Sequence, residues 1–358
     1  MEVATKFQLE KTGLENMSTT VENQAVLVDR FNRVHDYVRI SITDKCSLKC
    51  VYCMPEEGLE FFPDEKVLSK DEIVQMVKNF AKMGIKKIRL TGGEPLMRHD
   101  ILDIISEINA ISEIEDIALT TNGLALSRQA EKLWNAGLKR LNISLDTFDS
   151  EKYREITRGG NIRQVLQGIE AASQFPFKIK MNVVVIGGQN DNEIADFLRY
   201  SIENPVNVRF IEFMPIGHKS KRDNQLWQSK YRRIDDIFDI CHENHWSYKS
   251  IKFDGNGPSE NFKIDGSKGS FGLIHPVSCK FCESCNRLRV TADGALKSCL
   301  YWDDEDNLRE TIYDFDKFSA LIHKSLDGKP ENHEMALSEN EKNEFHKPTW
   351  RHMSQIGG

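Results

Sequence analysis

The sequence lacks any long apolar segment. It contains no run of about 18 apolar residues, the length that a membrane-spanning helix needs, and no hydrophobic leader behind a basic start. Acidic residues also outnumber basic ones. The chain has 55 aspartates and glutamates and 48 lysines and arginines, which gives a net charge of −7. These absences argue against a membrane protein. They predict a cytoplasmic protein that has no global positive field to attract nucleic acid.

The chain is long enough for one large domain and a smaller partner. Its 358 residues, 39% of them hydrophobic, can bury a core without disulfides. Residues 1–26 are polar and lack hydrophobic periodicity, so we expect a flexible extension, within which Met17 is a second candidate for the native start. We expect the main domain at 27–245 and a second region at 246–358.

The main domain alternates β-branched runs with amphipathic stretches, which is typical of successive βα units around a parallel sheet. Strands are expected at Tyr37–Thr43, Lys86–Leu90, Asp116–Thr121, Arg140–Leu145, Lys178–Ile186 and Asn207–Phe213. Helices are expected at Ser69–Met83, Asp100–Ser112, Ser127–Ala136, Ser150–Ser173 and Asp191–Glu203. Right-handed crossovers would curl these units into a partial (β/α)6 barrel, an α/β fold.

The expected strands have one apolar face and one polar face. In the first strand Val38 and Ile40 share a face, while Arg39 and Ser41 share the opposite one, because side chains alternate with period two. Three further strands show the same alternation. If helices cover the apolar faces, the polar and cationic faces line the barrel interior and imply a bound anion. Solvated edge strands are the alternative interpretation.

A first group of cysteines, Cys46, Cys50 and Cys53, directly follows the first strand, at the end where barrel enzymes place their chemistry. Three thiolates at this spacing can hold three irons of a [4Fe–4S] cluster and leave the fourth iron open for a ligand. A zinc site with a histidine as fourth ligand is the alternative. His35 and His99 have no ligand-like spacing relative to these cysteines.

An aromatic residue, Tyr52, precedes the last cysteine of this group, and Gly92-Gly93-Glu94-Pro95 follows the second strand. With these motifs the sequence resembles the radical S-adenosylmethionine superfamily. The resemblance implies that a reduced [4Fe–4S] cluster cleaves S-adenosylmethionine to a 5′-deoxyadenosyl radical, and that the protein excludes water and holds the target C–H bond. The cofactor-binding residues that it implies are Tyr52, Gly92, Gly93, Glu94, Thr120, Asn122, Ser144, Arg209 and Met214.

A second group of cysteines, Cys282, Cys285 and Cys299, surrounds an expected hairpin. A zinc knuckle that staples a small domain is one interpretation. The run is also similar to the C-terminal signature of the GTP 3′,8-cyclases of molybdenum cofactor biosynthesis, and the similarity extends to the final Gly357-Gly358. This resemblance implies a second [4Fe–4S] cluster with an open iron, and a C-terminus that enters the active site.

The same resemblance implies a lyase that converts GTP to (8S)-3′,8-cyclo-7,8-dihydroguanosine 5′-triphosphate, the first step of molybdopterin biosynthesis. The substrate-binding residues that it implies are Arg39, Lys87, Arg89, Lys180, Arg287 and Arg289. The catalytic residues that it implies are Arg287, Arg289, Gly357 and Gly358. Arginines suit planar, bidentate recognition of phosphate, which agrees with these assignments.

The implied partners are GTP, a low-potential electron donor such as flavodoxin or ferredoxin, and the next enzyme of the pathway, cyclic pyranopterin monophosphate synthase. A homodimer is one candidate assembly. Two other functions stay open: another radical enzyme with an auxiliary cluster that acts on a peptide or RNA, and a non-enzymatic metal-binding module. We expect Cys279 and Cys241 not to be cluster ligands.

Overall fold

The computed structural model describes residues 26–217, 227–252, 257–335 and 347–357, so the predicted extension lies almost wholly outside the described residues. A twelve-stranded sheet forms its centre. In chain order its strands are β3 (Tyr37–Ser41), β4 (Lys87–Thr91), β5 (Asp116–Thr121), β6 (Arg140–Ser144), β7 (Lys178–Val185), β8 (Asn207–Glu212), β9 (Tyr248–Ile251), β10 (Glu260–Ile264), β11 (Ser270–Ile274), β12 (Arg287–Val290), β13 (Ala295–Lys297) and β14 (Asp306–Asn307). A separate hairpin pairs β1 (Leu27–Val28) with β2 (Val34–His35).

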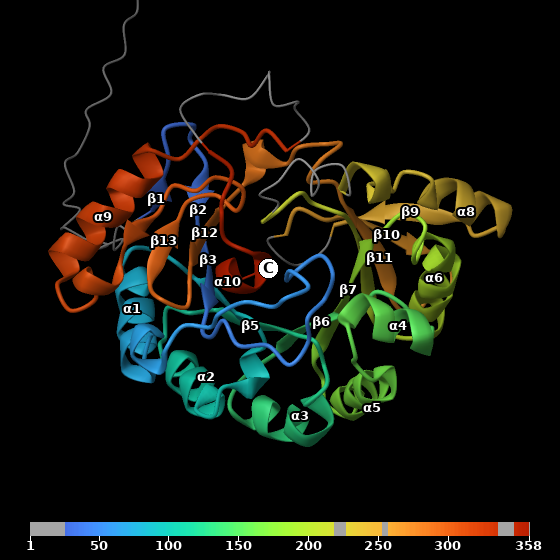
Figure 1. Cartoon of the computed structure of the whole chain (residues 1–358), viewed down its shortest axis with the longest axis horizontal. Helices are drawn as coiled ribbons and strands as arrows, with labels where there is room; N and C mark the ends of the chain where they lie inside the picture. Colours follow the sequence, from blue (N-terminus) through green and yellow to red (C-terminus); the bar gives the residue numbers. More distant parts are fainter. Residues whose placement is uncertain (1–25, 218–226, 253–256, 336–346, 358) are drawn as a thin grey trace, which may run out of the picture.

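The described helices, except the last, form an arc around the outside of this sheet in Figure 1. They are α1 (Lys70–Lys82), α2 (Ile101–Asn109), α3 (Leu126–Asn135), α4 (Ser150–Thr157), α5 (Ile162–Ser173), α6 (Ile194–Glu203), α8 (Ile237–Glu243), α9 (Phe315–Asp327) and α10 (Met353–Ile356). Short 3₁₀ turns lie at Asp64–Lys66, Pro95–Met97, Asp191–Glu193, Cys282–Ser284 and Arg309–Thr311. In the part of the chain that the structure describes, each helix is too short or too polar to cross a bilayer.

The sheet order is β14-β13-β12-β3-β4-β5-β6-β7-β8-β11-β10-β9. The strands from β12 through β3 to β8 and on to β11 pair in parallel, and antiparallel strands continue the sheet at both ends. The predicted α/β fold is therefore confirmed, and each of the six predicted strands has both of its ends within two residues of the observed ones.

Two strands of the second region join the barrel strands directly. β11 pairs in parallel with β8, and β12 pairs in parallel with β3, which sets Arg289 opposite Arg39. The sheet therefore crosses the expected boundary near residue 245, and the division into two domains stays a prediction.

The predicted single helix at Ser150–Ser173 is wrong. α4 ends at Thr157, and Arg158 and Gly159 adopt positive φ angles of 53° and 118°. α5 begins after Asn161, whose side chain accepts a hydrogen bond from the backbone NH of Arg163. Glycine tolerates this left-handed backbone and lowers helix propensity, so the chain turns there between two helices.

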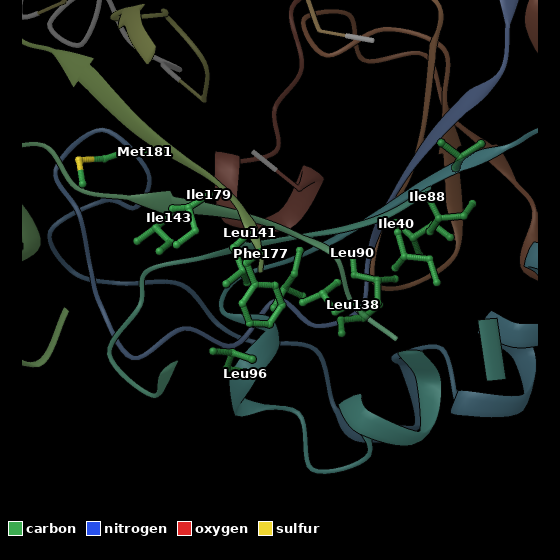
Figure 2. Close-up of a cluster of buried hydrophobic side chains, with 14 of the residues drawn as sticks. Ile40, Ile88, Leu90, Leu96, Leu138, Leu141, Ile143, Phe177, Ile179 and Met181 are labelled. Carbon is green, nitrogen blue, oxygen red and sulfur yellow. The ribbon is translucent and has the colours of Figure 1, made fainter. Parts of the chain in front are cut away.

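The hydrophobic core lies between the sheet and the helices. Ile40, Leu90, Leu141 and Ile143 project from the strands and are fully buried. Figure 2 shows them packed in one cluster with other apolar side chains from neighbouring strands. Because this outer face holds the apolar set, the polar set of the same strands turns to the inside of the barrel. α10 and the C-terminus lie in the middle of the view, inside the arc (Figure 1).

Candidate active site

A cavity opens inside the barrel at the carboxyl ends of the parallel strands. Its empty volume is about 1360 Å³, including space that is open to solvent. The predicted site residues that line it are Arg39, Cys46, Cys50, Tyr52, Cys53, Arg89, Gly92, Gly93, Glu94, Thr120, Asn122, Ser144, Arg209, Met214, Arg287 and Arg289. The fold thus gathers most of the predicted residues from segments that are far apart in the sequence.

The first cysteine trio occupies the loop after β3. Burial raises the pKa of Cys46 and Cys50, and it raises the pKa of Cys53 to about 12. Neighbouring thiolates raise the pKa of Cys50 and Cys53 further. Three thiolates packed this closely require compensating positive charge, which an iron–sulfur cluster supplies. Among the described residues no group of three His, Cys, Asp or Glu side chains is arranged around a single metal ion.

The glycine pair after β4 packs directly on this cysteine loop. A Cβ on Gly93 would stand 2.2 Å from the carbonyl oxygen of Lys45, and a Cβ on Gly92 would stand 2.4 Å from that of Thr43. The backbone NH of Gly93 donates to the Thr43 carbonyl at 2.7 Å. Only glycine permits this approach, so the pair fixes the cysteine loop against the strand end.

Glu94 is buried and its carboxylate is fully engaged. It accepts hydrogen bonds from the backbone NH of Leu96 at 3.0 Å, from the Thr121 hydroxyl at 2.7 Å and from the backbone NH of Asn122 at 2.7 Å. Glu94 therefore ties the end of β4 to the end of β5. Next to it, the buried Thr120 hydroxyl has no hydrogen-bond partner among the described residues, and it lines the cavity where a ligand could engage it.

Asp146, which follows β6, was not among the predicted site residues. The Tyr52 hydroxyl donates to Asp146 Oδ2 at 2.6 Å, and the Val184 backbone NH donates to Oδ1 at 2.8 Å. Burial raises the pKa of Asp146 to about 6. Its only sequence signal was its place two residues after Ser144 at a strand end, and that signal does not reveal the contact with Tyr52.

Cationic side chains crowd the inner face of the barrel. The Nε atoms of Arg39, Arg89 and Arg209 are buried and have no hydrogen-bond partner within the described ranges. Burial and then the charge of neighbouring arginines lower the pKa of Lys180 to about 6 and that of Arg209 to about 9. Like charges buried together in this way call for an anionic ligand.

Lys87 and Lys180 do not line the main cavity. Both line a smaller pocket beside it, nearer to the amino-terminal ends of the strands, and Arg89 lines both pockets. Lys87 Nζ also forms an ion pair with Asp36 Oδ2 at 3.0 Å. If Lys87 contacts substrate as predicted, it does so while it is also paired with the Asp36 carboxylate. The contact with substrate stays a prediction.

The second cysteine trio lines an adjoining pocket that shares Arg287 and Arg289 with the main cavity. The three thiols are those of Cys282, Cys285 and Cys299. Of the two remaining cysteines, Cys241 is fully buried in the hydrophobic core and Cys279 is exposed.

Charge beside Cys285 favours its thiolate, whereas burial raises the pKa of Cys282. Burial raises the pKa of Cys285, but the cations Arg287 and Lys329 oppose it and bring the pKa down to about 6. A thiolate at neutral pH is the form that binds iron. The donor set of this trio therefore fits an iron–sulfur cluster as well as the first one does.

The C-terminal segment reaches the same cavity. Arg289 donates from Nη1 to the carbonyl oxygen of Gly357 at 2.7 Å. Gly357 has a positive φ of 70°, and a Cβ there would stand 2.5 Å from Thr91 Cγ2, so the position requires glycine. Gly358 lies outside the described residues, and its predicted role cannot be placed.

Comparisons with known proteins show the family of this chain. Residues 40–201 match the family model of the radical SAM superfamily, and residues 206–335 match the model described as Molybdenum Cofactor Synthesis C. The chain is 58% identical to a GTP 3′,8-cyclase of Limosilactobacillus fermentum, over 93% of this chain and 99% of that protein. It is 56% identical to that of a Listeria monocytogenes strain and 41% identical to that of Clostridium perfringens, over 93% and 92% of this chain and 99% of each relative.

Among solved structures the chain resembles Streptococcus suis SuiB bound to S-adenosylmethionine. The TM-score is 0.52 at 15% sequence identity, and the match covers 82% of this chain and 69% of that one. At this identity the likeness supports the fold alone.

Proposed function

This chain belongs to the GTP 3′,8-cyclase family of the radical SAM superfamily, and we propose that it converts GTP to (8S)-3′,8-cyclo-7,8-dihydroguanosine 5′-triphosphate at the start of molybdenum cofactor biosynthesis. The observation that carries the proposal is that two cysteine trios open onto adjoining cavities that share the same two arginines.

Family membership implies a [4Fe–4S] cluster and S-adenosylmethionine as cofactors. We assign Cys46, Cys50 and Cys53 to that cluster. When bound, the pair supplies a 5′-deoxyadenosyl radical that abstracts a hydrogen atom. The chain itself positions the cofactor and the substrate, and it excludes water from the site. Gly93 and Glu94 fix the loops around the cofactor, and the Thr120 hydroxyl offers an unused hydrogen bond.

The substrate is held by cations. Arg39, Arg89 and Arg209 line the main cavity with buried Nε atoms, and their guanidinium groups can donate to the triphosphate or to the carboxylate of S-adenosylmethionine. Arg209 is already oriented, because its Nη2 donates to Asn142 Oδ1 at 2.7 Å and to Asn182 Oδ1 at 2.5 Å. A phosphate anion relieves the mutual repulsion of these cations.

Cys282, Cys285 and Cys299 would hold a second [4Fe–4S] cluster beside the substrate. The lowered pKa of Cys285 and the shared lining of the two pockets support this assignment. Arg287 and Arg289 stand between the cavities, where they can orient the guanine and ribose. The hydrogen bond from Arg289 to Gly357 supports a catalytic role for the C-terminal segment in the same place.

Partners follow from the reaction class. The chemistry needs a low-potential electron donor, for which flavodoxin and ferredoxin are the candidates, and the product requires a further enzyme, cyclic pyranopterin monophosphate synthase in the resembling family. Oxygen-sensitive clusters and clustered free thiols favour the reducing cytoplasm. A homodimer is the candidate assembly.

The test is anaerobic incubation of the reconstituted protein with GTP, S-adenosylmethionine and a strong reductant, followed by mass spectrometry. The expected products are 5′-deoxyadenosine and the cyclised nucleotide, from protein with about eight irons per chain. Replacement of Cys46, Cys50 and Cys53 by alanine should abolish both products, while Cys279→Ser, an exposed cysteine outside both cavities, is the matched control. Turnover without the first trio, or zinc in place of iron, would contradict the proposal.

A further inference from the structure

Lys329 is a buried lysine that no step described above uses. It follows α9, its side chain is among the largest that are fully buried, and the whole residue is 2% exposed. Its Nζ contacts three acceptors: His35 Nε2 at 2.8 Å, the Arg287 carbonyl oxygen at 2.9 Å and Cys285 Sγ at 3.6 Å. An ammonium group has three N–H donors and no acceptor, so these contacts use all of its donors.

His35 is set up to receive one of these hydrogen bonds. Its Nδ1 lies 2.8 Å from the carbonyl oxygen of Arg33, which can only accept, so Nδ1 carries the ring proton. Burial and the charge of Lys329 lower the pKa of His35 to about 3, which keeps the ring neutral. Nε2 is therefore an acceptor that points at Lys329.

The hairpin that carries His35 is itself pinned to the second cysteine trio. Arg33 donates to the backbone carbonyl oxygens of Cys282 at 3.0 Å, Glu331 at 2.9 Å and Pro330 at 3.0 Å. The β1–β2 hairpin thus lies against the segments around Cys282 and Pro330, and it holds His35 beside Lys329.

The negative charge that favours a cation at Lys329 comes from cysteine. Of the three groups that the Lys329 Nζ contacts, the Cys285 sulfur is the one that carries negative charge as a thiolate. A buried cation is stable only when it is paired, and here the pairing group is the ligand set of the proposed cluster.

We propose that Lys329 is a positioning residue of the second cysteine trio, whose ammonium donates a hydrogen bond to the Cys285 sulfur and raises the reduction potential of the cluster bound there. The inference rests on the proposed second cluster. A positive charge and a hydrogen bond to a ligating sulfur both stabilise the more negative, reduced cluster. Lys329 acts through Cys285 and need not touch substrate.

The experiment is a redox titration, monitored by electron paramagnetic resonance, of anaerobically reconstituted full-length protein. Lys329→Met keeps the side-chain length and removes the charge and the donors. We expect the ratio of reduced to oxidised second cluster at a fixed potential to fall about tenfold, a shift of about 59 mV for a one-electron couple. The first cluster, in the same sample, should not shift.

Two further variants complete the design. Lys324→Met removes an exposed lysine on α9 that pairs with Asp306, and it should leave both potentials unchanged. Lys329→Arg keeps the charge and should stay near the wild-type potential. Lys329→Met could lose the second cluster altogether. In that case the inference is supported if Lys329→Arg keeps the cluster and the cluster has the wild-type potential.

Unchanged potentials in Lys329→Met, or loss of the second cluster in both Lys329 variants, would overturn the inference while the proposed function stands. Wild-type protein with only about four irons and a single cluster signal would instead overturn the proposed second cluster, and the inference with it.

Discussion

Arg351→Met should release the C-terminal segment from the active site. The Arg351 side chain is 5% exposed and bridges two carboxylates. Its Nε and Nη2 donate to Glu305 at 2.8 Å, and its Nη2 and Nη1 donate to Asp293 at 3.0 and 3.2 Å. Six residues further on, Gly357 accepts the hydrogen bond from Arg289. Arg351 is therefore the ionic anchor from which the final turn reaches the cavity.

The free-energy cost of Arg351→Met depends on which partners the two carboxylates keep after the arginine is removed. Removal of one partner of a buried ion pair costs about 3–5 kcal/mol when the remaining charge has no other partner. Here Glu305 keeps Lys297 and Asp293 keeps the Thr291 hydroxyl, and both carboxylates are partly exposed. We therefore expect the lower end, about 3 kcal/mol, which raises the local opening equilibrium roughly 100-fold.

Hydrogen–deuterium exchange, read by mass spectrometry on peptides from 347–357, measures this opening. Exchange should accelerate roughly 100-fold there and stay unchanged in α1, and GTP turnover should fall with it. Arg309→Met is the control, because the Arg309 side chain forms a bidentate pair with Glu72 and otherwise donates to the backbone of Glu65 and Lys66, not to the tail. Unchanged exchange in the tail peptides would refute the reasoning and assign the anchoring to the backbone contacts of Thr349 and Lys347 with 301–303.

Three further changes have defined outcomes. Arg89→Ala should weaken GTP binding in calorimetry by about tenfold or more without loss of iron, because one charge-assisted contact is lost; unchanged affinity would remove Arg89 from the site. Tyr52→Phe leaves buried Asp146 short of a hydrogen bond and should speed iron release to a chelator roughly tenfold, whereas equal release would mean that the contact does not hold the loop. The Glu212 carboxylate raises the pKa of His275, so protonated His275 stabilises the fold fully below about pH 6.5 and that stabilisation is lost as pH rises through the raised pKa. His275→Gln should flatten the change in unfolding midpoint between pH 6 and pH 8.5, and a variant as pH-dependent as the wild type would exclude this pair as the cause.

The local pattern was enough to locate the six barrel strands and the two cysteine trios. β-Branched alternation reflects the two faces of a strand, and the polar faces do line the cavity, as Arg39 and Arg89 show. The glycine pair Gly92-Gly93 could also be recognised from the sequence, because the lack of a side chain is a property of the residues themselves.

The pairing of strands from distant parts of the chain could not be predicted from local sequence patterns. The short strands β11 and β12 carry no signal that names β8 and β3 as their partners, because strand pairing depends on which edges tertiary packing leaves open. The helix break at Gly159 was local and could have been predicted from two adjacent glycines, but the surrounding amphipathic pattern masked it.

The sequence by itself therefore determined the chemistry, through thiol spacing and the alternation of polar and apolar side chains. Only the tertiary structure decided the electrostatics: which lysine is paired with a carboxylate, as Lys87 is with Asp36, and which is buried against a cysteine, as Lys329 is against Cys285. The physical reason is that spacing is a property of residues close together in the chain, whereas the pairing of a buried charge depends on groups that folding brings together from distant parts of the sequence.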